Sequence, residues 1–335
     1  MAKNEKKKGS LALRIISAVL CLIIVLVLIV AIGFSIGENL VFIKFYMNAD
    51  KEFKIPGLWT GSVPQGFEYI DDMDTFIYTG YQKDKVSASV IYVMPDDGEG
   101  EPRCIEMLNN DGTPYTGHAG GITIHGDITY VATSKGVDLF STFDMLDSDN
   151  KVTKIGKIST DIDVAFCEVN GNKLYLGNFY RAVDYETPES NHITTPSGDK
   201  NTAVIYEYDI DPALGVPRVT EPVAVYSIGN AIQGLAFTED GRMILSSSWG
   251  LSKSHIYVHK KPEASGQSFE LKGRSIPLYF LDSSTLEKDI IAPPMAEELV
   301  YEDGDIYIMN EAASMKYLFG KLTGAKWCYA YELED

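Results

Sequence analysis

The chain has 335 residues, of which 45% are hydrophobic and 23% charged, and a formal net charge of -18 at pH 7. This composition supports a full-sized hydrophobic core in one domain of about 280 residues. The acidic balance argues against nucleic acids as partners and against a surface that lies on anionic lipid, because like charges repel.

The N-terminal stretch at residues 15–34 is apolar and carries no charge. About 20 such residues in a helix cross a hydrocarbon core of about 30 Å. The lysine-rich residues before it predict a cytoplasmic N-terminus and an exported remainder. A cleaved signal peptide would have a shorter apolar region and a small-residue cleavage motif, which this stretch lacks. We expect a cytoplasmic tail at 1–14, a transmembrane helix at 15–34 and a juxtamembrane stalk at 35–50.

A unit with several short strands recurs in the remaining residues, 51–335. Its clearest copy, residues 231–249, has an apolar strand, a tight turn at Glu239-Asp240-Gly241 and a second strand. Similar units begin near Gln65, Gly120, Asp163 and Glu297. A repeat of this size predicts an all-β fold, a β-propeller in which each copy supplies one four-stranded blade.

The strand patterns predict five blades. The last copy lacks an outermost strand, whereas residues 51–56 (KEFKIP) stand before the first copy, where such a strand is expected. We predict that this N-terminal strand closes the ring against the last blade, which removes both exposed sheet edges. In the fourth copy we assign IPLYFLD (276–282) as the third strand, and HIYVHK (255–260) is left over. Six blades remain open if HIYVHK belongs to a further blade.

Loop lengths single out one face of the propeller. Two connections between second and third strands, near residues 180–201 and 311–326, are much longer than the other connections. Long loops on a rigid scaffold often carry function. Candidate binding residues on this face come from the starts of the innermost strands and the ends of the second strands. They are Gln65, Tyr81, His118, Asp163, Asn178, Tyr180, Gln233, Trp249, Glu297, Glu298, Asn310 and Glu311.

These residues also have structural interpretations. The polar side chains that begin the innermost strands can satisfy backbone groups around a water-filled channel. Trp249 is a candidate stacking platform, but aromatic residues also pack between blades. Both interpretations stay open at the level of the sequence.

Acidic residues on this face suggest two kinds of chemistry. Two carboxylates that flank a sugar bond could act as the acid/base and nucleophile of a glycosidase. Carboxylates could instead bind Ca²⁺ through oxygen ligands. The histidines lack zinc-binding spacing, and the chain has no phosphate-binding loop or G-x-S-x-G motif. We therefore expect no cofactor other than Ca²⁺, for which Asp163 and Glu297 are the candidate ligands.

A resemblance to a known family rests on short sequence segments at the starts of three units: VPQGF, HAGGI and IQGLAF, the last followed by ILSSSWG. The region from Phe53 to Leu333 resembles the strictosidine synthase, gluconolactonase and paraoxonase-like propellers, and is most similar to uncharacterised secreted bacterial propellers of that kind. In those enzymes Glu, Asn and Asp surround an axial Ca²⁺. At the corresponding positions here, only Asp163 and Glu297 are acidic.

The sequence therefore predicts a single-pass, membrane-anchored propeller outside the cytoplasm, at a bacterial cell surface. It would bind a small molecule, a glycan or a protein partner on its long-loop face. The alternative is a hydrolase of a lactone or glycan, with Asp163 and Glu297 as metal ligands or as an acid/base pair.

Overall fold

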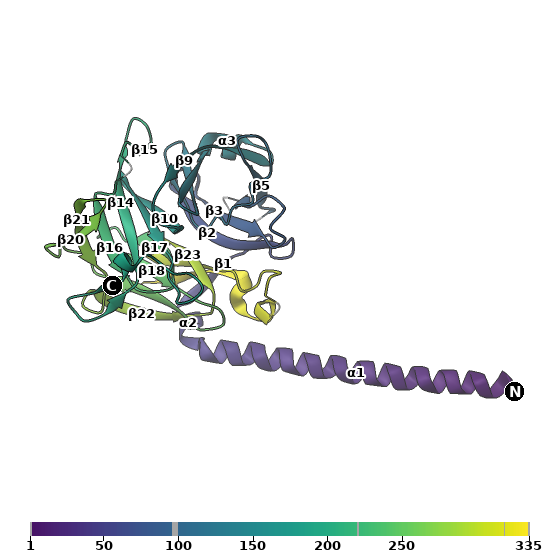
Figure 1. The fold of residues 1–335 in the computed structure, drawn as a ribbon. Helices are drawn as coiled ribbons and strands as arrows, with labels where there is room; N and C mark the ends of the chain where they lie inside the picture. The colour runs from purple at the N-terminus through teal and green to yellow at the C-terminus, as the bar shows by residue number, and fades with distance from the viewer. Residues whose placement is uncertain (1, 96–99, 220, 318, 334–335) are drawn as a thin grey trace.

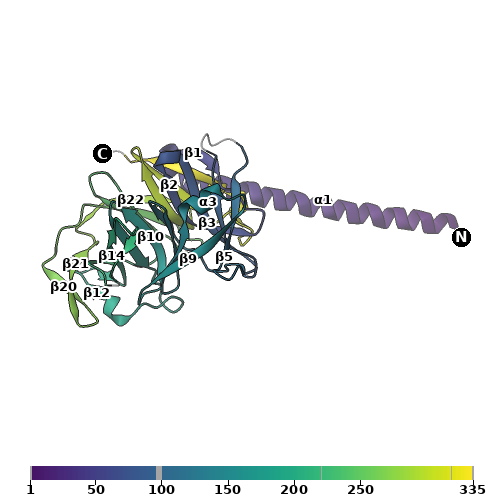
Figure 2. The same cartoon turned by 90° about the horizontal axis from the view of Figure 1, so that it is seen from above.

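The computed structural model describes residues 2–95, 100–219, 221–317 and 319–333. A long helix, α1 (Ala2–Val41), projects from a domain built mostly of short β-strands (Figures 1 and 2). Two shorter α-helices are described, α2 (Ile43–Met47) and α3 (Thr142–Asp147). The fold is therefore mostly β with one long apolar helix at the N-terminus, as the sequence predicts.

In the part of the chain that the structure describes, five inner strands surround a common axis. They are β2 (Ser62–Ile70), β6 (Ile122–His125), β10 (Val164–Asn170), β17 (Ile232–Phe237) and β23 (Ala296–Glu302). Each strand contacts the next, and β23 contacts β2, so the ring closes. This radial arrangement is that of a β-propeller.

Each inner strand begins an antiparallel group of four strands. The outer members of the first group are β3 (Thr75–Gln82), β4 (Val90–Val93) and β5 (Arg103–Leu108); those of the second are β7 (Ile128–Thr133), β8 (Gly136–Ser141) and β9 (Lys151–Ser159). The third group adds β11 (Lys173–Asn178), β14 (Ala203–Asp211) and β16 (Ala224–Ile228), and the fourth adds β18 (Met243–Ser247), β19 (Ser254–His259) and β22 (Leu286–Ala292). The last group has β24 (Asp305–Asn310), β25 (Trp327–Glu332) and β1 (Ala49–Lys54).

Strand β1 forms the outer edge of the last group. It pairs antiparallel with β25, with Lys51 opposite Tyr329. The sequence places this strand at 51–56, and the structure places it two residues earlier. Because one end of the domain is hydrogen-bonded to the other, the last sheet is completed by the chain's own N-terminal strand.

The fourth group differs from its predicted strand order. Its third strand is β19, which contains HIYVH and pairs with β18 on one side and β22 on the other. Our assignment of IPLYFLD as the third strand is therefore wrong. Those residues lie largely in β21 (Arg274–Phe280), which forms a hairpin with β20 (Gln267–Leu271) and runs parallel to β16 of the third group. Alternating apolar residues occur in both strands, so the pattern could not tell them apart.

The first two groups join through their outermost strands. Strand β5 runs parallel to β9, with Met107 opposite Val152, so the two groups form one eight-stranded sheet. This sheet curls almost into a barrel (Figure 1). Buried apolar side chains such as Ile91, Phe140 and Met145 pack in a single cluster between its two halves.

The remaining described elements are short and lie in connections. They are β12 (Ile193–Thr194), β13 (Lys200–Asn201), β15 (Val216–Pro217) and the 3-10 turns η1 (Asp71–Met73), η2 (Glu189–Asn191), η3 (Phe319–Leu322) and η4 (Gly324–Lys326). Both predicted long loops carry such elements. The connection after β11 holds η2, β12 and β13, and the connection after β24 holds η3 and η4.

The segment predicted as a stalk packs against the propeller. Residues 35–50 form the end of α1, all of α2 and the start of β1. Phe42 and Phe45 are buried in a cluster with Ile256 of the fourth group and Ile308 of the last group. Helix α2 also contacts β1 and β22, the outermost strands of those two groups. Helix α2 is therefore fixed at the rim of the propeller, between its fourth and last strand groups.

Candidate ligand site at one end of the axis

A β-bulge shapes the start of four inner strands. The pairing register shifts between Pro64 and Phe67 in β2 and between Ala296 and Leu299 in β23. Equivalent shifts occur in β10 after Val164 and in β17 after Ile232. The residues at the shifts are Gln65-Gly66, Ala165, Gln233 and Glu297-Glu298. Since a bulge re-aims side chains, these positions are where the inner strands can turn polar groups toward the axis.

The bulges correct one of the polar residues that the sequence predicted at the starts of the innermost strands. In β10 the residue equivalent to Gln233 is Ala165, two positions after Asp163. Asp163 is exposed, accepts a hydrogen bond from Ser134 (2.7 Å) and forms an ion pair with Lys135 (3.3 Å). It therefore lies with the turn after β7 instead of joining Glu297 in the row.

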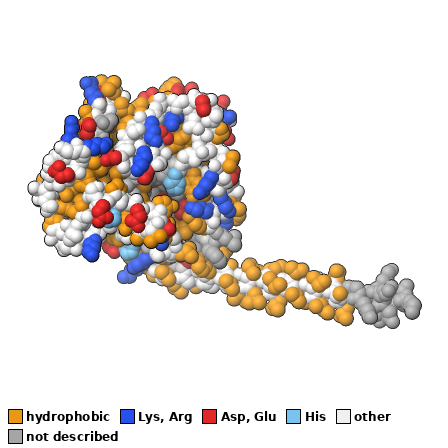
Figure 3. Space-filling model, in the orientation of Figure 1, with side chains coloured by type: hydrophobic (Ala, Val, Ile, Leu, Met, Phe, Trp, Pro, Cys, Tyr) orange, Lys and Arg blue, Asp and Glu red, His pale blue; other side chains and the backbone are white. Residues whose placement is uncertain are grey.

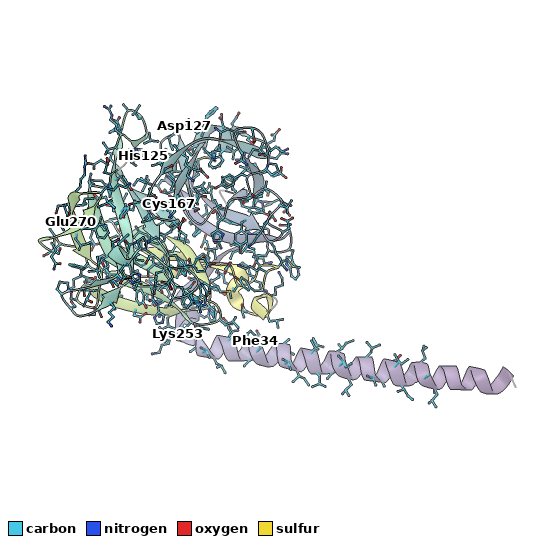
Figure 4. The ribbon with its side chains drawn as sticks, in the orientation of Figure 1. Phe34, His125, Asp127, Cys167, Lys253 and Glu270 are labelled. Atoms are coloured by element: carbon cyan, nitrogen blue, oxygen red, sulfur yellow. The ribbon has the colours of Figure 1, made fainter. Side chains whose placement is uncertain are left out.

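Glu298, at the bulge of β23, is hydrogen-bonded to three other inner strands. Its Oε2 accepts backbone N–H bonds from Phe67 (2.8 Å) and Ile122 (2.9 Å), and its Oε1 accepts one from Cys167 (3.3 Å). One buried carboxylate thus links β23 to β2, β6 and β10. Figure 4 marks Cys167 near the middle of the propeller. Both oxygens are held by backbone, so Glu298, predicted as a ligand-binding residue, has a structural place.

The inner strands are so close here that a side chain does not fit between them. A Cβ atom on Gly234 would come 2.6 Å from the Cα of Glu298, and one on Gly121 would come 2.7 Å from the backbone nitrogen of Cys167. Neighbouring inner strands are therefore in backbone contact at this level.

Two buried carboxyl groups lie on the long-loop side of Glu298. The Glu311 carboxyl accepts hydrogen bonds from Gln65 (3.3 Å) and from the hydroxyl of Tyr317 (2.7 Å), and the Lys316 ammonium lies 3.8 Å away. Burial and repulsion from Glu311 raise the pKa of Glu297 well above its usual value. Burial also raises the pKa of Glu311, although Lys316 opposes the change.

Tyr81 and His118 stand beside these carboxyl groups. Lys316 donates a hydrogen bond to the Tyr81 hydroxyl (2.6 Å), and the Tyr81 ring centroid lies 4.8 Å from that of His118. His118 is exposed at the rim. Desolvation raises the pKa of Tyr81, so the Tyr81 ring is neutral at pH 7.

Asn310 is the least satisfied polar side chain of this region. It is fully buried, and neither its amide nitrogen nor its carbonyl oxygen has a hydrogen-bond partner among the described residues. The buried hydroxyls of Ser62 and Ser314 are also unpartnered in the described part of the chain. Leaving such a group unsatisfied costs about 1–3 kcal/mol, and natural proteins do so rarely and often where a ligand or ion binds.

We call this set of residues the axial site. It consists of Ser62, Gln65, Tyr81, His118, Glu297, Asn310, Glu311, Ser314, Lys316 and Tyr317. The sequence pointed to six of them. It missed Ser62, Ser314, Lys316 and Tyr317, although three of these lie in the long connection that we had singled out by its length.

An aromatic cluster borders the axial site. The ring of Trp249 lies 6.0 Å from Phe179 and 5.8 Å from Tyr185, and the guanidinium of Arg181 lies 4.1 Å above it. Tyr185 is near enough to Tyr81 to raise the pKa of that hydroxyl, so the cluster reaches the axial site. Trp249 is 38% exposed. Arg181 lies over one face of the Trp249 ring, so the role of Trp249 as a stacking platform stays a prediction.

The other predicted site residues serve packing or backbone roles. The Asn178 side chain accepts a hydrogen bond from the backbone of Val204 (2.8 Å), which ties β11 to β14. Tyr180 packs edge-on against His192, with ring centroids 5.0 Å apart. Gln233 is partly buried at the bulge of β17.

The donor set does not fit the Ca²⁺ site that the resemblance implies. Among the described residues, no group of three or more histidine, cysteine, aspartate or glutamate side chains could hold a metal. Asp163 is paired with Lys135, and the ammonium of Lys316 already stands beside Glu311. A divalent cation would be repelled by that ammonium at the position where the carboxyl groups meet.

The opposite end of the axis carries a second carboxyl pair that we did not predict. Glu68 accepts a hydrogen bond from Thr123 (2.7 Å), whose oxygen in turn accepts one from the backbone of Val169 (3.0 Å). Burial raises the pKa of Glu68 to about 7. Burial and repulsion from Glu68 raise that of Glu168 well above its usual value. Both glutamates lie within apolar strand patterns, and no local signal marks them as a pair.

No protein-family model matches the chain, and no curated protein matches it. Solved structures do resemble it in fold. A putative glucose dehydrogenase from Thermus thermophilus has 12% identity and a TM-score of 0.45, over 84% of this chain and 98% of that one. A putative gluconolactonase has 9% identity and a TM-score of 0.40, over 85% and 91%. The WD40 β-propeller domain of Doa1 has 10% identity and a TM-score of 0.39, over 81% and 79%.

The putative gluconolactonase bears the name of one of the enzyme groups to which the sequence is similar. At these identities the likeness concerns the fold alone. We carry no activity over from these proteins, and the function is argued from the site.

Proposed function

We propose that this protein is a single-pass membrane protein whose five-bladed, extracytoplasmic propeller binds a small polyhydroxylated ligand, such as a saccharide, in the axial site. The observation that carries the proposal is Asn310, whose buried amide has both a donor and an acceptor without partners among the described residues. A ligand hydroxyl can donate and accept at once, so it would satisfy such an amide.

The charge state of the axial site favours a neutral ligand. The raised pKa of Glu297 keeps that carboxyl protonated over a wider pH range, and Lys316 offsets the charge of Glu311. Closely spaced hydrogen-bond donors and acceptors of low net charge suit the hydroxyl groups of a sugar better than an ion. Because Asn310 is buried, a small molecule also fits better than the surface of a folded protein.

A hydrolase of a lactone or glycan is the second candidate. It is favoured by the two buried, mutually repelling carboxyl groups of Glu297 and Glu311, since a carboxyl with a raised pKa can act as a general acid near neutral pH. Glu297 and Glu311 would then carry the roles that we had assigned to Asp163 and Glu297. Catalysis would show as release of products from a bound saccharide or lactone, with loss of activity in Glu297→Gln while binding persists.

The test is a thermal-shift and calorimetric screen of the full chain in detergent against neutral mono- and oligosaccharides. We expect at least one saccharide to bind, and its affinity to fall about tenfold to hundredfold in Asn310→Ala, which corresponds to the 1–3 kcal/mol of a buried hydrogen-bond set. Asn170→Ala, at the exposed end of β10, is the control. Absence of binding across the screen, or equal binding by Asn310→Ala, would contradict the proposal.

A further inference from the structure

Helix α1 meets the propeller at a defined residue. Every residue from 11 to 30 is exposed, whereas Ala31, Ser35 and Glu38 lie on a covered face, four and three residues apart. The covered face continues into Phe42 and Phe45 of the propeller core. The exposed residues 11–30 make a helix about 30 Å long, which matches a bilayer's hydrocarbon core. The propeller therefore begins where the membrane would end, with no intervening linker.

The apolar stretch of α1 is longer than the bilayer needs. The candidate span, Leu11–Val41, has 31 residues and would measure about 46 Å. Its last eleven residues consequently run alongside the propeller. Turn η3 contacts α1, and the hydroxyl of Tyr46 bonds to Glu38. Figure 4 marks Phe34 on the part of α1 that lies beneath this side of the propeller.

Three segments, one of which contacts α1 through η3, form a surface that we call the lower flank. They are residues 57–61, residues 83–86, and the described residues 314–317 and 319–326 of the connection after β24. Lys321 joins two of them: it donates hydrogen bonds to the carbonyls of Leu58 (3.0 Å) and Ala313 (2.8 Å). Lys83, in the segment at 83–86, joins it to the connection after β24 by donating a hydrogen bond to the carbonyl of Met315 (2.9 Å). The lower flank is thus one continuous surface.

Large apolar side chains are exposed on the lower flank. Trp59 is 76% exposed and Val86 is 74% exposed, and Met315 and Leu322 are also exposed. The ammonium of Lys321 lies 3.7 Å from the centroid of the Trp59 ring. Tryptophan with nearby lysine is the combination that membrane proteins place at the lipid headgroup level.

The charge of the lower flank is opposite to that of the chain. Residues 317–331 contain Lys321 and Lys326 and no aspartate or glutamate, in a protein of net charge -18. Lys83 and Lys85 add to them, and the one acid between them, Asp84, offsets one of these two charges. Figure 3 shows basic and hydrophobic side chains together on the side of the propeller above α1.

We propose that the lower flank rests on the anionic phospholipid headgroups of the membrane that α1 crosses, with Trp59 and Leu322 at the headgroup level. This inference rests on the membrane anchoring under the proposed function. From the overall negative charge we expected a surface that does not lie on anionic lipid. The lower flank differs from the rest of the surface, because positive side chains are concentrated where the chain enters the bilayer. Lysine side chains near an anionic lipid surface are attracted to it electrostatically.

The test uses the full chain reconstituted in vesicles of brominated phosphatidylcholine, with or without phosphatidylglycerol, and follows quenching of tryptophan fluorescence. We expect quenching in vesicles that contain the anionic lipid. Most of it should be lost in Trp59→Phe and retained in Trp249→Phe, since Trp249 lies in the aromatic cluster beside the axial site. Lys85→Glu should reduce the quenching. Lys272→Glu, another exposed turn lysine with positive φ, should leave it unchanged.

Extraction with alkaline carbonate separates the two proposals. If the chain is extracted, α1 does not span the bilayer and both are overturned. If the chain stays inserted but Trp59 is not quenched, only the lower-flank proposal is overturned. Equal quenching without phosphatidylglycerol, unaffected by Lys85→Glu, would overturn the assignment to anionic headgroups.

Discussion

Glu298 of β23 accepts a hydrogen bond from the backbone N–H of Ile122 of β6 at 2.9 Å, although 176 residues separate them in the chain. The same carboxyl group accepts backbone N–H bonds from Phe67 and Cys167. A single side chain of the last strand group thus ties together the inner strands of the first three groups.

Replacing Glu298 should destabilise the whole propeller. In Glu298→Gln the amide nitrogen cannot accept a hydrogen bond, so at least one buried backbone N–H loses its partner, at a cost of about 1–3 kcal/mol in the free energy of unfolding. Urea denaturation of the full chain in detergent measures this. Glu302→Gln, on the same strand but partly exposed, should change stability little. Equal stability of the two variants would refute the role given to Glu298.

The close approach of the inner strands makes Gly234 irreplaceable. A Cβ atom there would lie 2.6 Å from the Cα of Glu298 and 3.2 Å from the carbonyl oxygen of Glu297, both backbone atoms that cannot move aside cheaply. Gly234→Ala should therefore cost about 1–3 kcal/mol or more through overpacking. Gly229→Ala is the matched control, since its Cβ would meet nothing within 4 Å. Thermal unfolding of both variants decides the matter, and a tolerated Gly234→Ala would show that the ring is looser than described.

The residues before β1 should matter for stability as well as for anchoring. Phe45 is 2% exposed between the fourth and last groups, so Phe45→Ala should lower the free energy of unfolding by about 3–5 kcal/mol. Ile43, on the same short helix, is 48% exposed, and Ile43→Ala should cost far less. Denaturation curves of both variants make the comparison. Similar small losses would mean that this segment is a separate stalk.

Buried carboxyl groups predict how stability depends on pH. The pKa of Glu68 is raised to about 7, and those of Glu168 and Glu297 are also raised, so the folded state binds more protons than the unfolded state above about pH 4.5. Stability should therefore fall as pH rises from about 5 to 8, through the raised pKa values. The share from Glu68 is on the order of 3 kcal/mol.

The measurement for this dependence is the unfolding temperature between pH 5 and pH 8. Glu68→Gln should flatten the profile by removing a group that holds its proton more tightly when folded. Glu263→Gln, an exposed residue in the connection after β19, should leave the profile unchanged. A profile that rises across this range would contradict the pKa shifts at both ends of the axis.

The sequence could predict what depends on local pattern. Strand alternation and turn residues indicated the radial sheets and the strand that lies opposite Tyr329. Loop length pointed to the side of the axis where Gln65, Glu297 and Asn310 meet. These features depend on residues close together in the chain.

Features that depend on distant pairing could not be predicted. The bulge in β10 moves the position equivalent to Gln233 from Asp163 to Ala165, and no local signal marks it. The parallel pairing of β21 with β16 attaches a hairpin to a neighbouring group, which the alternation of IPLYFLD does not reveal. Lys316 joins Glu311 and Tyr81 only because the connection after β24 folds back over the axis.

The most direct measurement of the central claim is an experimental structure of the full chain with a saccharide selected by the binding screen. The account predicts a ligand hydroxyl within hydrogen-bond distance of the Asn310 amide, beside Glu297 and the Tyr81 ring. A structure in which both amide atoms of Asn310 bond only to the protein, with the saccharide elsewhere, would contradict it.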